Sequence, residues 1–176
     1  MKKYLNATKM IVYLGLLTAL EIVLSRFLSI NAWNTKIGFS FIPIVAAAIL
    51  FGPLPAAIVG ALGDFLGALI FPIGPYFPGF TATAFICGIV RGLFLRKKHS
   101  FGKTVLLSAV SAAICQLILG LFLNTLWIGI LYGTEYAPLL ITRITQCVLL
   151  FVVETAVAVG LSYPLRRLKE AFIINK

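Results

Sequence analysis

Residues 105–130 read VLLSAVSAAICQLILGLFLNTLWIGI, an apolar stretch that contains no charged side chain. A helix that crosses the hydrocarbon core of a bilayer needs about 20 such residues, because each residue adds about 1.5 Å to its length. The stretch is therefore long enough to span a membrane. We expect a transmembrane helix over about residues 103–130.

The composition of the whole chain indicates the same class of protein. Of the 176 residues, 61% are hydrophobic and only 11% are charged, and the mean hydropathy is +1.06. Soluble proteins carry roughly 25% charged residues, so water cannot be the main solvent of this chain. We therefore expect a multi-pass protein of the cell membrane, with the lipid bilayer as its surroundings.

The basic residues are concentrated in a few short regions of the sequence. A net charge of +10 can indicate nucleic-acid binding, but the lysines and arginines cluster between apolar runs instead of following a groove, so we expect no nucleic-acid partner. The main clusters lie at residues 2–9, 96–103 and 166–169. Basic loops favour the cytoplasmic side, and an even number of spans must separate loops on one side. We therefore expect both termini to be cytoplasmic.

Glycine, proline and charged residues divide the chain into six expected helices. They cover about residues 8–30, 39–51, 56–71, 80–95, 103–130 and 136–163. We predict an all-α, six-helix transmembrane bundle that forms a single domain over residues 1–176. The second helix covers only roughly 20 Å of a hydrocarbon core about 30 Å thick, so we expect it to be a short, partly re-entrant segment.

Charged side chains inside the expected helices are candidates for function, because each costs at least about 2.5 kcal/mol in the hydrocarbon region. These side chains are Glu21, Arg26, Asp64, Arg91, Arg143 and Glu154. Asp64 flanks a stripe of small residues in the third expected helix, and a binding or pairing role is favoured over contact with lipid. Arg26 lies near the outer surface, where snorkelling to headgroups is the alternative to a binding role.

Two polar stripes recur at helical spacing in the last two expected helices. Gln116, Gly120, Asn124 and Trp127 form one stripe, and Arg143, Gln146 and Glu154 form the other. Residues at such spacings share one face of a helix. The stripes predict a wet or ligand-filled interior, with hydrogen bonding between helices as the alternative.

The loop at residues 75–80 combines prolines with three aromatic side chains at the expected outer face. Three further aromatic residues are expected on this side: Trp33, Trp127 and Tyr132. Such residues are common at membrane interfaces, but together they can form a lid that stacks on a flat aromatic ligand. Basic side chains that can hold a carboxylate of that ligand are Arg26, Lys36 and Arg143.

The sequence carries no motif for hydrolysis or for energy coupling. Residues 102–104 resemble the end of a nucleotide-binding P-loop, but Lys97 stands where that pattern needs glycine. The three cysteines lie inside apolar runs, and we interpret them as small buried hydrophobic residues. We expect no enzyme activity, no catalytic residue, no metal and no cofactor, so a transporter of this size would take its energy from partner subunits.

Gly15 and Ala19 form a small-xxx-small pair on the first expected helix, a spacing that suits close packing against another helix. Such pairs are common in apolar helices. We treat Gly15 and Ala19 as candidate partner-binding residues.

Several motifs together resemble one family. They are Arg26-Phe27-Leu28, residues 35–43, Gly63-Asp64-Phe65 and residues 72–81. With six short helices and the helix-one pair, these motifs resemble the folate-specific S components of energy-coupling factor (ECF) vitamin transporters. The resemblance covers the first four helices well and the last two only through Asn124 and residues 143–146. In that family the helix-one pair is usually Ala-x-x-x-Ala, whereas Gly15 stands first here.

The resemblance implies high-affinity folate binding from outside, and toppling of the S component in the membrane to release the vitamin. It also implies a complex with a transmembrane T component and two cytoplasmic ATPases that hydrolyse the ATP. The alternatives are an S component for another vitamin, such as riboflavin, thiamine or niacin, a small channel, or a membrane enzyme.

The residues fit folate chemically. A carboxylate such as Asp64, or an amide such as Asn124 or Gln146, can pair with the edge of the pterin ring, while a basic residue meets the glutamate tail. The expected substrate-binding residues are Arg26, Trp33, Lys36, Asp64, Tyr76, Phe77, Phe80, Asn124, Trp127, Arg143 and Gln146.

Overall fold

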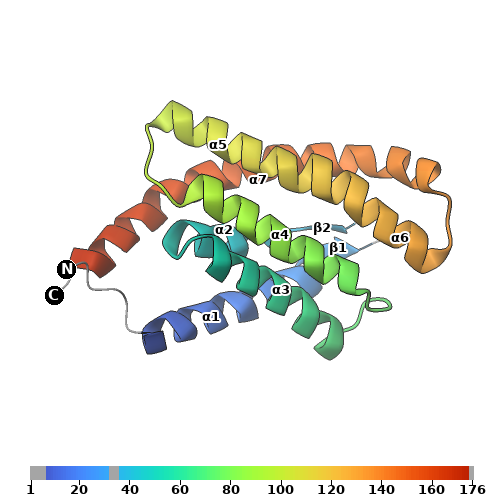
Figure 1. Ribbon diagram of the computed structural model, residues 1–176, viewed down its shortest axis with the longest axis horizontal. Coiled ribbons are helices and arrows are strands. Elements are labelled where there is room, and N and C mark those ends of the chain that lie inside the picture. The colour runs from blue at the N-terminus through green and yellow to red at the C-terminus, as the bar shows by residue number, and fades with distance from the viewer. Residues whose placement is uncertain (1–6, 32–35, 175–176) are drawn as a thin grey trace.

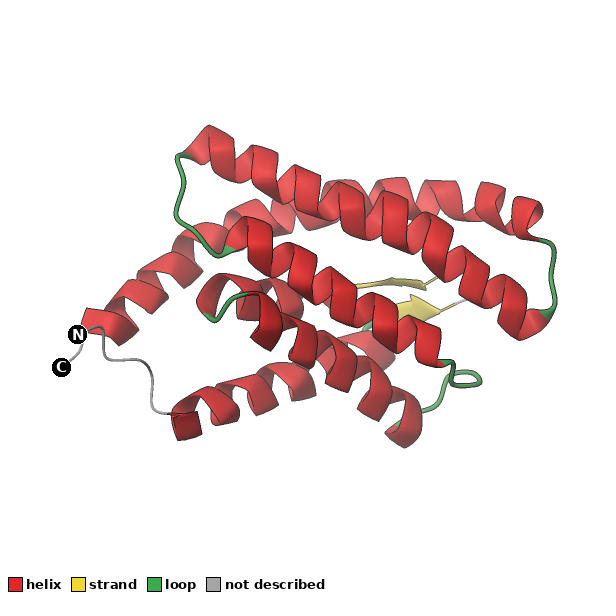
Figure 2. Cartoon of the chain, in the orientation of Figure 1, coloured by secondary structure: helices red, strands yellow, loops and turns green. Residues whose placement is uncertain are grey.

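A computed structural model describes residues 7–31 and 36–174. The first half of the fold contains α1 (Ala7–Arg26), β1 (Ser29–Asn31), β2 (Lys36–Gly38), α2 (Phe41–Leu50), α3 (Pro53–Ile70) and α4 (Pro78–Leu95). The second half contains α5 (Phe101–Ala113), the π-helix η1 (Ile114–Leu123), α6 (Asn124–Tyr132) and α7 (Tyr136–Ile174). α5, η1 and α6 follow one another without a break and form a single rod. Figure 2 shows the helices, with the two short strands seen between their ribbons.

Among the described residues, five helical segments are long and apolar enough to cross a membrane. They are α1, α3, α4, the α5–η1–α6 rod and α7. The prediction of an all-α, six-helix membrane bundle is therefore confirmed, with α2 as the short sixth member. At ten residues, α2 is only about 15 Å long.

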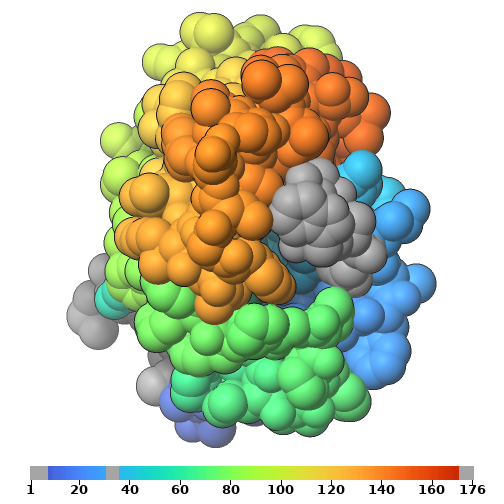
Figure 3. Space-filling view, turned by 90° about the vertical axis from the view of Figure 1, so that its right-hand side faces the viewer, coloured from blue at the N-terminus to red at the C-terminus, as the bar shows by residue number. Residues whose placement is uncertain are grey.

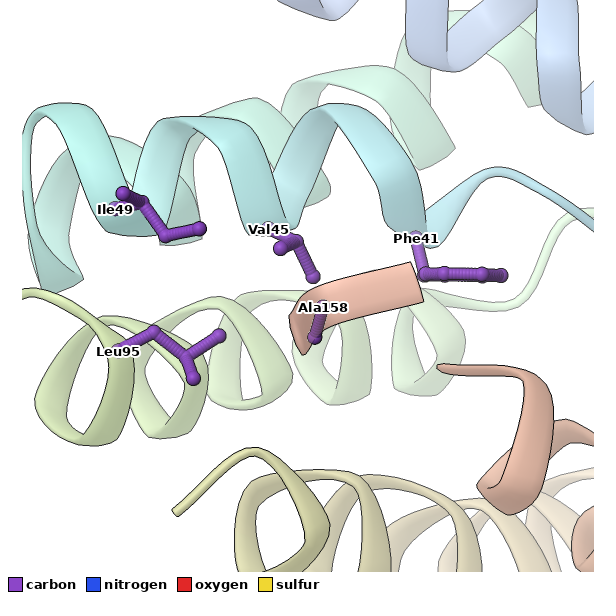
Figure 4. Close-up of a cluster of buried hydrophobic side chains, with 5 residues drawn as sticks. All are labelled: Phe41, Val45, Ile49, Leu95 and Ala158. Atoms are coloured by element: carbon purple, nitrogen blue, oxygen red, sulfur yellow. The ribbon is translucent and has the colours of Figure 1, made fainter. Parts of the chain in front are cut away.

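α2 lies buried among its neighbours, which explains how so short an apolar helix is held. Its residues Phe41, Val45 and Ile49 pack with Leu95 of α4 and Ala158 of α7 (Figure 4). Because protein surrounds α2, its ends do not have to reach the two lipid headgroup layers. Phe41, at the start of α2, also lines the cavity described below, so the cluster adjoins the polar interior.

The first helix ends earlier than expected. It stops at Arg26, and an antiparallel hairpin follows in which Ile30 pairs with Ile37. The hydroxyl of Ser29 donates a hydrogen bond to the carbonyl oxygen of Ser25 at 2.6 Å, so a side chain satisfies a carbonyl at the helix end. The expectation that the helix continues to Ile30 was wrong, because the chain turns at Phe27 and Leu28 and Ile30 lies in β1.

The last helix continues farther than expected. We expected it to end near Pro164, but α7 runs through this proline to Ile174. Proline lacks one helical hydrogen bond, and tertiary contacts compensate for it. Arg166 Nη2 donates to the carbonyl oxygen of Leu95 at 3.3 Å, and Lys169 Nζ donates to that of Ile49 at 2.8 Å. Both contacts hold the extension of α7 against the ends of α4 and α2.

The third helix starts at Pro53 instead of near residue 56. Proline suits the first turn of a helix, because its missing N–H would have no partner there. Gly52 precedes it with a φ of 104°, a backbone conformation that favours glycine, and makes the sharp turn from α2 possible.

The basic regions lie at one end of the bundle. In Figure 1 the start of α1, the α4–α5 loop and the last turns of α7 are at the left, whereas the α3–α4 loop and the α6–α7 turn are at the right. The ion pair between Lys98 and Glu170, 2.8 Å apart, joins two of the left-hand regions. The expected even number of crossings between these regions is therefore present. That this end is cytoplasmic stays a prediction.

Glycines set the distances between the helices that surround the interior. A Cβ atom at Gly88 or Gly92 of α4 would collide with the backbone of Ala57 or Pro53 of α3, so these two helices cross closely. Gly63 and Gly67 on α3 have another role, because side chains of α1 fill the space beside them. The stripe of small residues on α3 thus opens room for polar groups.

Candidate substrate-binding site

A cavity of about 510 Å³ lies in the interior of the bundle. Its walls come from α1, β2, α2, α3, α4, η1, α6 and α7, and from the α3–α4 loop. Figure 3 views the end with this loop, where the surface is hollowed between the orange α6–α7 region and the green α3–α4 region. The volume is within the range of pockets for small organic ligands, roughly 300–1,000 Å³.

Aromatic side chains line the outer part of the cavity. They are Tyr76, Phe77, Phe80 and Tyr132. The ring of Phe77 contacts that of Phe80 at a centroid distance of 6.1 Å and that of Trp127 at 5.5 Å. Aromatic rings at such distances stabilise one another and offer flat apolar faces to a planar ligand. The structure thus brings several of the predicted aromatic residues together around Phe77, and that they form a lid over a ligand stays a prediction.

Trp127 supports this group without lining the cavity. Its indole Nε1 donates a hydrogen bond to the Thr83 hydroxyl at 3.1 Å, and its ring packs against Phe77. Trp127 therefore packs on Phe77 outside the cavity lining, and its hydrogen bond to Thr83 of α4 orients the indole ring. That it contacts substrate directly stays a prediction.

Charged residues of α1, α3 and β2 form one wall. Arg26 Nη2 donates to the carbonyl oxygen of Asp64 at 3.3 Å, and the Thr81 hydroxyl donates to Oδ2 of Asp64 at 2.6 Å. Lys36 and Glu21 line the cavity beside them. Burial lowers the pKa of the Lys36 ammonium, and the neighbouring Arg26 lowers it further. This wall thus holds two cations that attract carboxylates and two acidic groups that accept hydrogen bonds.

The opposite wall comes from η1, α6 and α7 and presents unpartnered polar atoms. Arg143 is only 5% exposed and donates from Nη2 to the carbonyl oxygen of Gly120 at 3.3 Å, while its Nε and Nη1 have no partner among the described residues. Gln146 donates to the backbone oxygen of Lys36 at 2.6 Å. The Oε1 atom of Gln146 and the Oδ1 atom of Asn124 also lack partners within the described part of the chain. Buried polar atoms without partners are costly, so this wall favours a polar ligand.

The π-helix contributes residues to this wall. A π-helix has wider turns than an α-helix and occurs often at functional sites. Cys115, Gln116 and Gly120 of η1 line the cavity, and Asn124 follows at the start of α6. Three members of the predicted polar stripe, Gln116, Gly120 and Asn124, therefore line the cavity, whereas the fourth, Trp127, does not. No sequence pattern indicated the change in helical type.

A buried ion pair closes the inner end of the cavity. Arg91 Nη2 contacts both carboxylate oxygens of Glu154 at 2.8 Å, and Gln116 Nε2 donates to the same carboxylate at 2.8 Å. Arg91 also donates to the carbonyl oxygen of Phe41 at 3.3 Å. These contacts join α4, α7, η1 and α2 below the ligand space. Arg91 and Glu154 were candidates as membrane charges, but one sequence does not reveal that they pair.

The cavity gathers most of the substrate-binding residues that the sequence predicted. Those on its walls are Arg26, Lys36, Asp64, Tyr76, Phe77, Phe80, Asn124, Arg143 and Gln146. Trp33 falls outside the described residues. The residues that the prediction omitted include Glu21, Arg91, Gln116 and Glu154, all of them polar groups at membrane depth. That these side chains touch a substrate stays a prediction.

Comparisons with known proteins identify the family of this chain. A family model for the ECF transporter substrate-specific component matches residues 9–165. The chain belongs to this family. It is therefore an S component, a multi-pass protein of the cell membrane with transport as its family role.

Two curated relatives of this S component are both called folate transporter FolT. The protein from Clostridium novyi is 38% identical over 172 residues, which cover 98% of this chain and 96% of the relative. The protein from Leuconostoc mesenteroides is 31% identical over 159 residues, which cover 89% of this chain and 83% of the relative.

Solved structures agree in fold. A crystal structure of FolT bound with folic acid has a TM-score of 0.81 and 31% sequence identity, and the match covers 90% of this S component and 95% of that chain. The S component of a bacterial ECF transporter has a TM-score of 0.67 and 20% identity, with 97% and 100% of the two chains covered. The latter likeness shows the shared fold alone.

Proposed function

We propose that this S component binds folate with high affinity and serves as the substrate-specific subunit of an ATP-driven ECF transporter for folate uptake. The observation that carries the proposal is the cavity itself. It combines flat aromatic faces with a buried guanidinium, Arg143, two of whose nitrogens have no partner among the described residues. The curated FolT relatives and the FolT structure with folic acid support the choice of vitamin.

Folate offers the groups that this cavity requires. Its pterin and aminobenzoyl rings are flat and can stack on Phe77, Phe80 or Tyr76. Its two carboxylates can pair with Arg143 on one wall and with Arg26 or Lys36 on the other. Its amide and ring N–H groups can donate to the side-chain oxygens of Asn124 and Gln146, which have no donor among the described residues. A vitamin without carboxylates would leave the cationic groups unpaired, which disfavours riboflavin and thiamine.

The proposal includes partners that supply the energy. No catalytic residue, metal or cofactor takes part in the S component's role, and two cytoplasmic ATPases hydrolyse ATP in the complex. A transmembrane T component would dock on α1, where Gly15 and Ala19 lie on the exposed face. Beyond the adjacent turns of α1, no atom of the described residues lies within 4 Å of a Cβ at Gly15. Small residues on an exposed helical face allow another helix to approach closely.

Binding of radiolabelled folic acid to the purified protein in lipid nanodiscs tests the proposal. Unlabelled folic acid should displace the label, whereas riboflavin, thiamine and niacin should not. Arg143→Ala should weaken binding by about 10- to 100-fold, because a charge-assisted hydrogen bond contributes roughly 1.5–3 kcal/mol. Displacement by one of the other vitamins at lower concentration than by folic acid would reject folate as the substrate.

A further inference from the structure

Glu21 is a buried carboxylate of the cavity whose hydrogen bonding is incomplete. Its side chain extends from α1, lines the cavity and is only 5% exposed. No donor in residues 7–31 and 36–174 reaches its Oε2 atom. An acceptor that is buried without a donor costs about 1–3 kcal/mol, and more when it is charged. A ligand that brings an N–H group to this carboxylate would remove that cost.

The other acidic groups of the cavity already have donors. Asp64 accepts from the hydroxyl of Thr81 at 2.6 Å. Glu154 accepts from Arg91 and from Gln116 at 2.8 Å each. Arg26, five residues beyond Glu21 on the same helix, donates to a backbone oxygen of α3 at 3.3 Å. Glu21 is therefore the acidic side chain best placed to receive a donor from the ligand.

Gly63 of α3 determines where the Glu21 carboxylate lies. A Cβ atom at position 63 would overlap that carboxylate, so the side chain of Glu21 fills space that only glycine leaves open. This packing fixes the end of a flexible side chain against α3, at the wall of the cavity. A fixed acceptor selects among ligands more strongly than a mobile one, because it cannot move to suit a ligand whose donors lie elsewhere.

We propose that Glu21 determines substrate specificity by accepting hydrogen bonds from the amino-substituted pyrimidine edge of the pterin ring. In that edge an amino group and a ring N–H point the same way, and a carboxylate is acceptor-only and takes such paired donors well. The inference rests on the proposed function, since it names the part of folate that Glu21 contacts. It assigns to Glu21 the role that the sequence had suggested for Asp64.

The test compares folic acid with an analogue in which hydrogen replaces the 2-amino group of the pterin ring. Isothermal titration calorimetry in nanodiscs measures both affinities for each variant. The wild type should prefer folic acid by about 10- to 100-fold, the range of a hydrogen bond to a charged group. The preference should nearly vanish in Glu21→Leu. It should be intermediate in Glu21→Gln, whose amide oxygen still accepts but carries no charge.

Gly63→Ala provides a second route to the same measurement. Its methyl group would meet the flexible end of Glu21 and no backbone atom among its three nearest neighbours, so the variant should fold and lose much of the preference. Gly160→Ala is the matched control, because a Cβ there meets no atom of another described helix within 4 Å, and it should keep the preference.

The two possible failures are distinct. If Glu21→Leu or Gly63→Ala binds folic acid and keeps the full wild-type preference, the role of Glu21 is overturned while folate binding stands. The same conclusion follows if the wild type binds both compounds equally. If the wild type binds no folic acid, the proposed function itself is overturned, and the assignment of Glu21 with it.

Discussion

The Arg91–Glu154 pair concentrates two opposite charges in a part of the bundle that water barely reaches, with side chains only 5% and 4% exposed. Removing one partner leaves the other charge buried and uncompensated, which costs about 3–5 kcal/mol in known cases. Arg91→Met should therefore lower the free energy of unfolding by that amount. The double variant Arg91→Met/Glu154→Leu should recover most of the loss, because neither charge is left at this site without its partner. Unfolding in mixed micelles, followed by circular dichroism, measures both.

The chain contains its own control for this prediction. Lys98 and Glu170 also form an ion pair at 2.8 Å, but their side chains are 73% and 50% exposed. Water and salt screen such a pair, so Lys98→Met should change stability little. Equal losses in Arg91→Met and Lys98→Met would show that burial does not determine the strength of the inner pair.

The ammonium group of Lys36 predicts a pH dependence of folate binding. Burial and the nearby Arg26 lower its pKa below the ordinary lysine value of 10.5. The charged form attracts a ligand carboxylate, so affinity should be full below the lowered pKa and should fall as the pH rises through it. A loss of about tenfold or more is expected for one charge-assisted contact. Calorimetric affinities over a pH series measure the effect.

Lys36→Arg is the matched variant for this titration, because a guanidinium keeps its charge throughout the accessible pH range. Its affinity should not fall in the window where that of the wild type does. An identical pH profile in both proteins would exclude Lys36 as the titrating contact.

At the scale of single residues, the candidate site could be located in the sequence because polar side chains cost free energy inside a membrane. Asp64, Arg143 and Gln146 stood out because polar groups are expensive in hydrocarbon, and the structure places all three on the cavity wall. Glu21 was equally conspicuous, yet its place beside Gly63 depends on how α1 and α3 pack. The pairing of Arg91 with Glu154 could not be read from positions 63 residues apart in one chain.

At the scale of helices, the close crossing of α3 and α4 makes a prediction about glycine. A Cβ at Gly88 would meet the backbone of Ala56 and Ala57, which cannot rotate away as a side chain does. Gly88→Ala should therefore force the two helices apart and lower the free energy of unfolding by about 1–3 kcal/mol. Thermal unfolding of the detergent-solubilised protein measures the loss.

Gly160→Ala serves as the comparison at this scale too. Its Cβ would meet no atom of another helix in the described part of the chain, and alanine favours the helical conformation over glycine by roughly 0.5–1 kcal/mol. This variant should be as stable as the wild type or more stable. A loss of stability equal to that of Gly88→Ala would mean that the close crossing is not what makes position 88 sensitive to an added methyl group.

Whether an element could be predicted depends on whether its own residues, or contacts with distant residues, stabilise it. Long apolar helices satisfy their own backbone groups, so hydropathy located them within a few residues. The β1–β2 hairpin satisfies its backbone only through pairing such as Ile30 with Ile37, and three-residue strands carry little periodic signal. The continuation of α7 past Pro164 depends on the contacts of Arg166 and Lys169 with other helices, which local rules do not include.

At the scale of the whole molecule, the polar interior and the basic regions lie toward opposite ends. The cavity is hollowed at the end with the α3–α4 loop, and the basic loop and α7 extension lie at the other end (Figures 1 and 3). If the basic end faces the cytoplasm, as the positive-inside rule predicts, the cavity opens outward. α1 then lies along the side of the bundle, with an exposed face available to a partner throughout the membrane.

This separation predicts that partner docking and folate binding can be disrupted independently. Gly15 and Ala19 lie on the exposed face of α1, whereas Glu21 and Arg26 face the cavity from the same helix. Large side chains in Gly15→Leu/Ala19→Leu would prevent close approach of a T-component helix without touching the cavity. The double variant should bind folic acid within about twofold of the wild type, since no binding contact changes. It should fail to copurify with the T component and the two ATPases.

Gly15→Ala is the conservative control, because a methyl group there has open space and restores the small pair typical of the family. It should assemble and support folate uptake in proteoliposomes as the wild type does. Assembly of the double leucine variant at wild-type yield would place the docking face elsewhere on the bundle. Loss of folate binding in that variant would instead show that α1 transmits changes at its outer face to the cavity, because the two introduced leucine side chains themselves cannot reach the ligand.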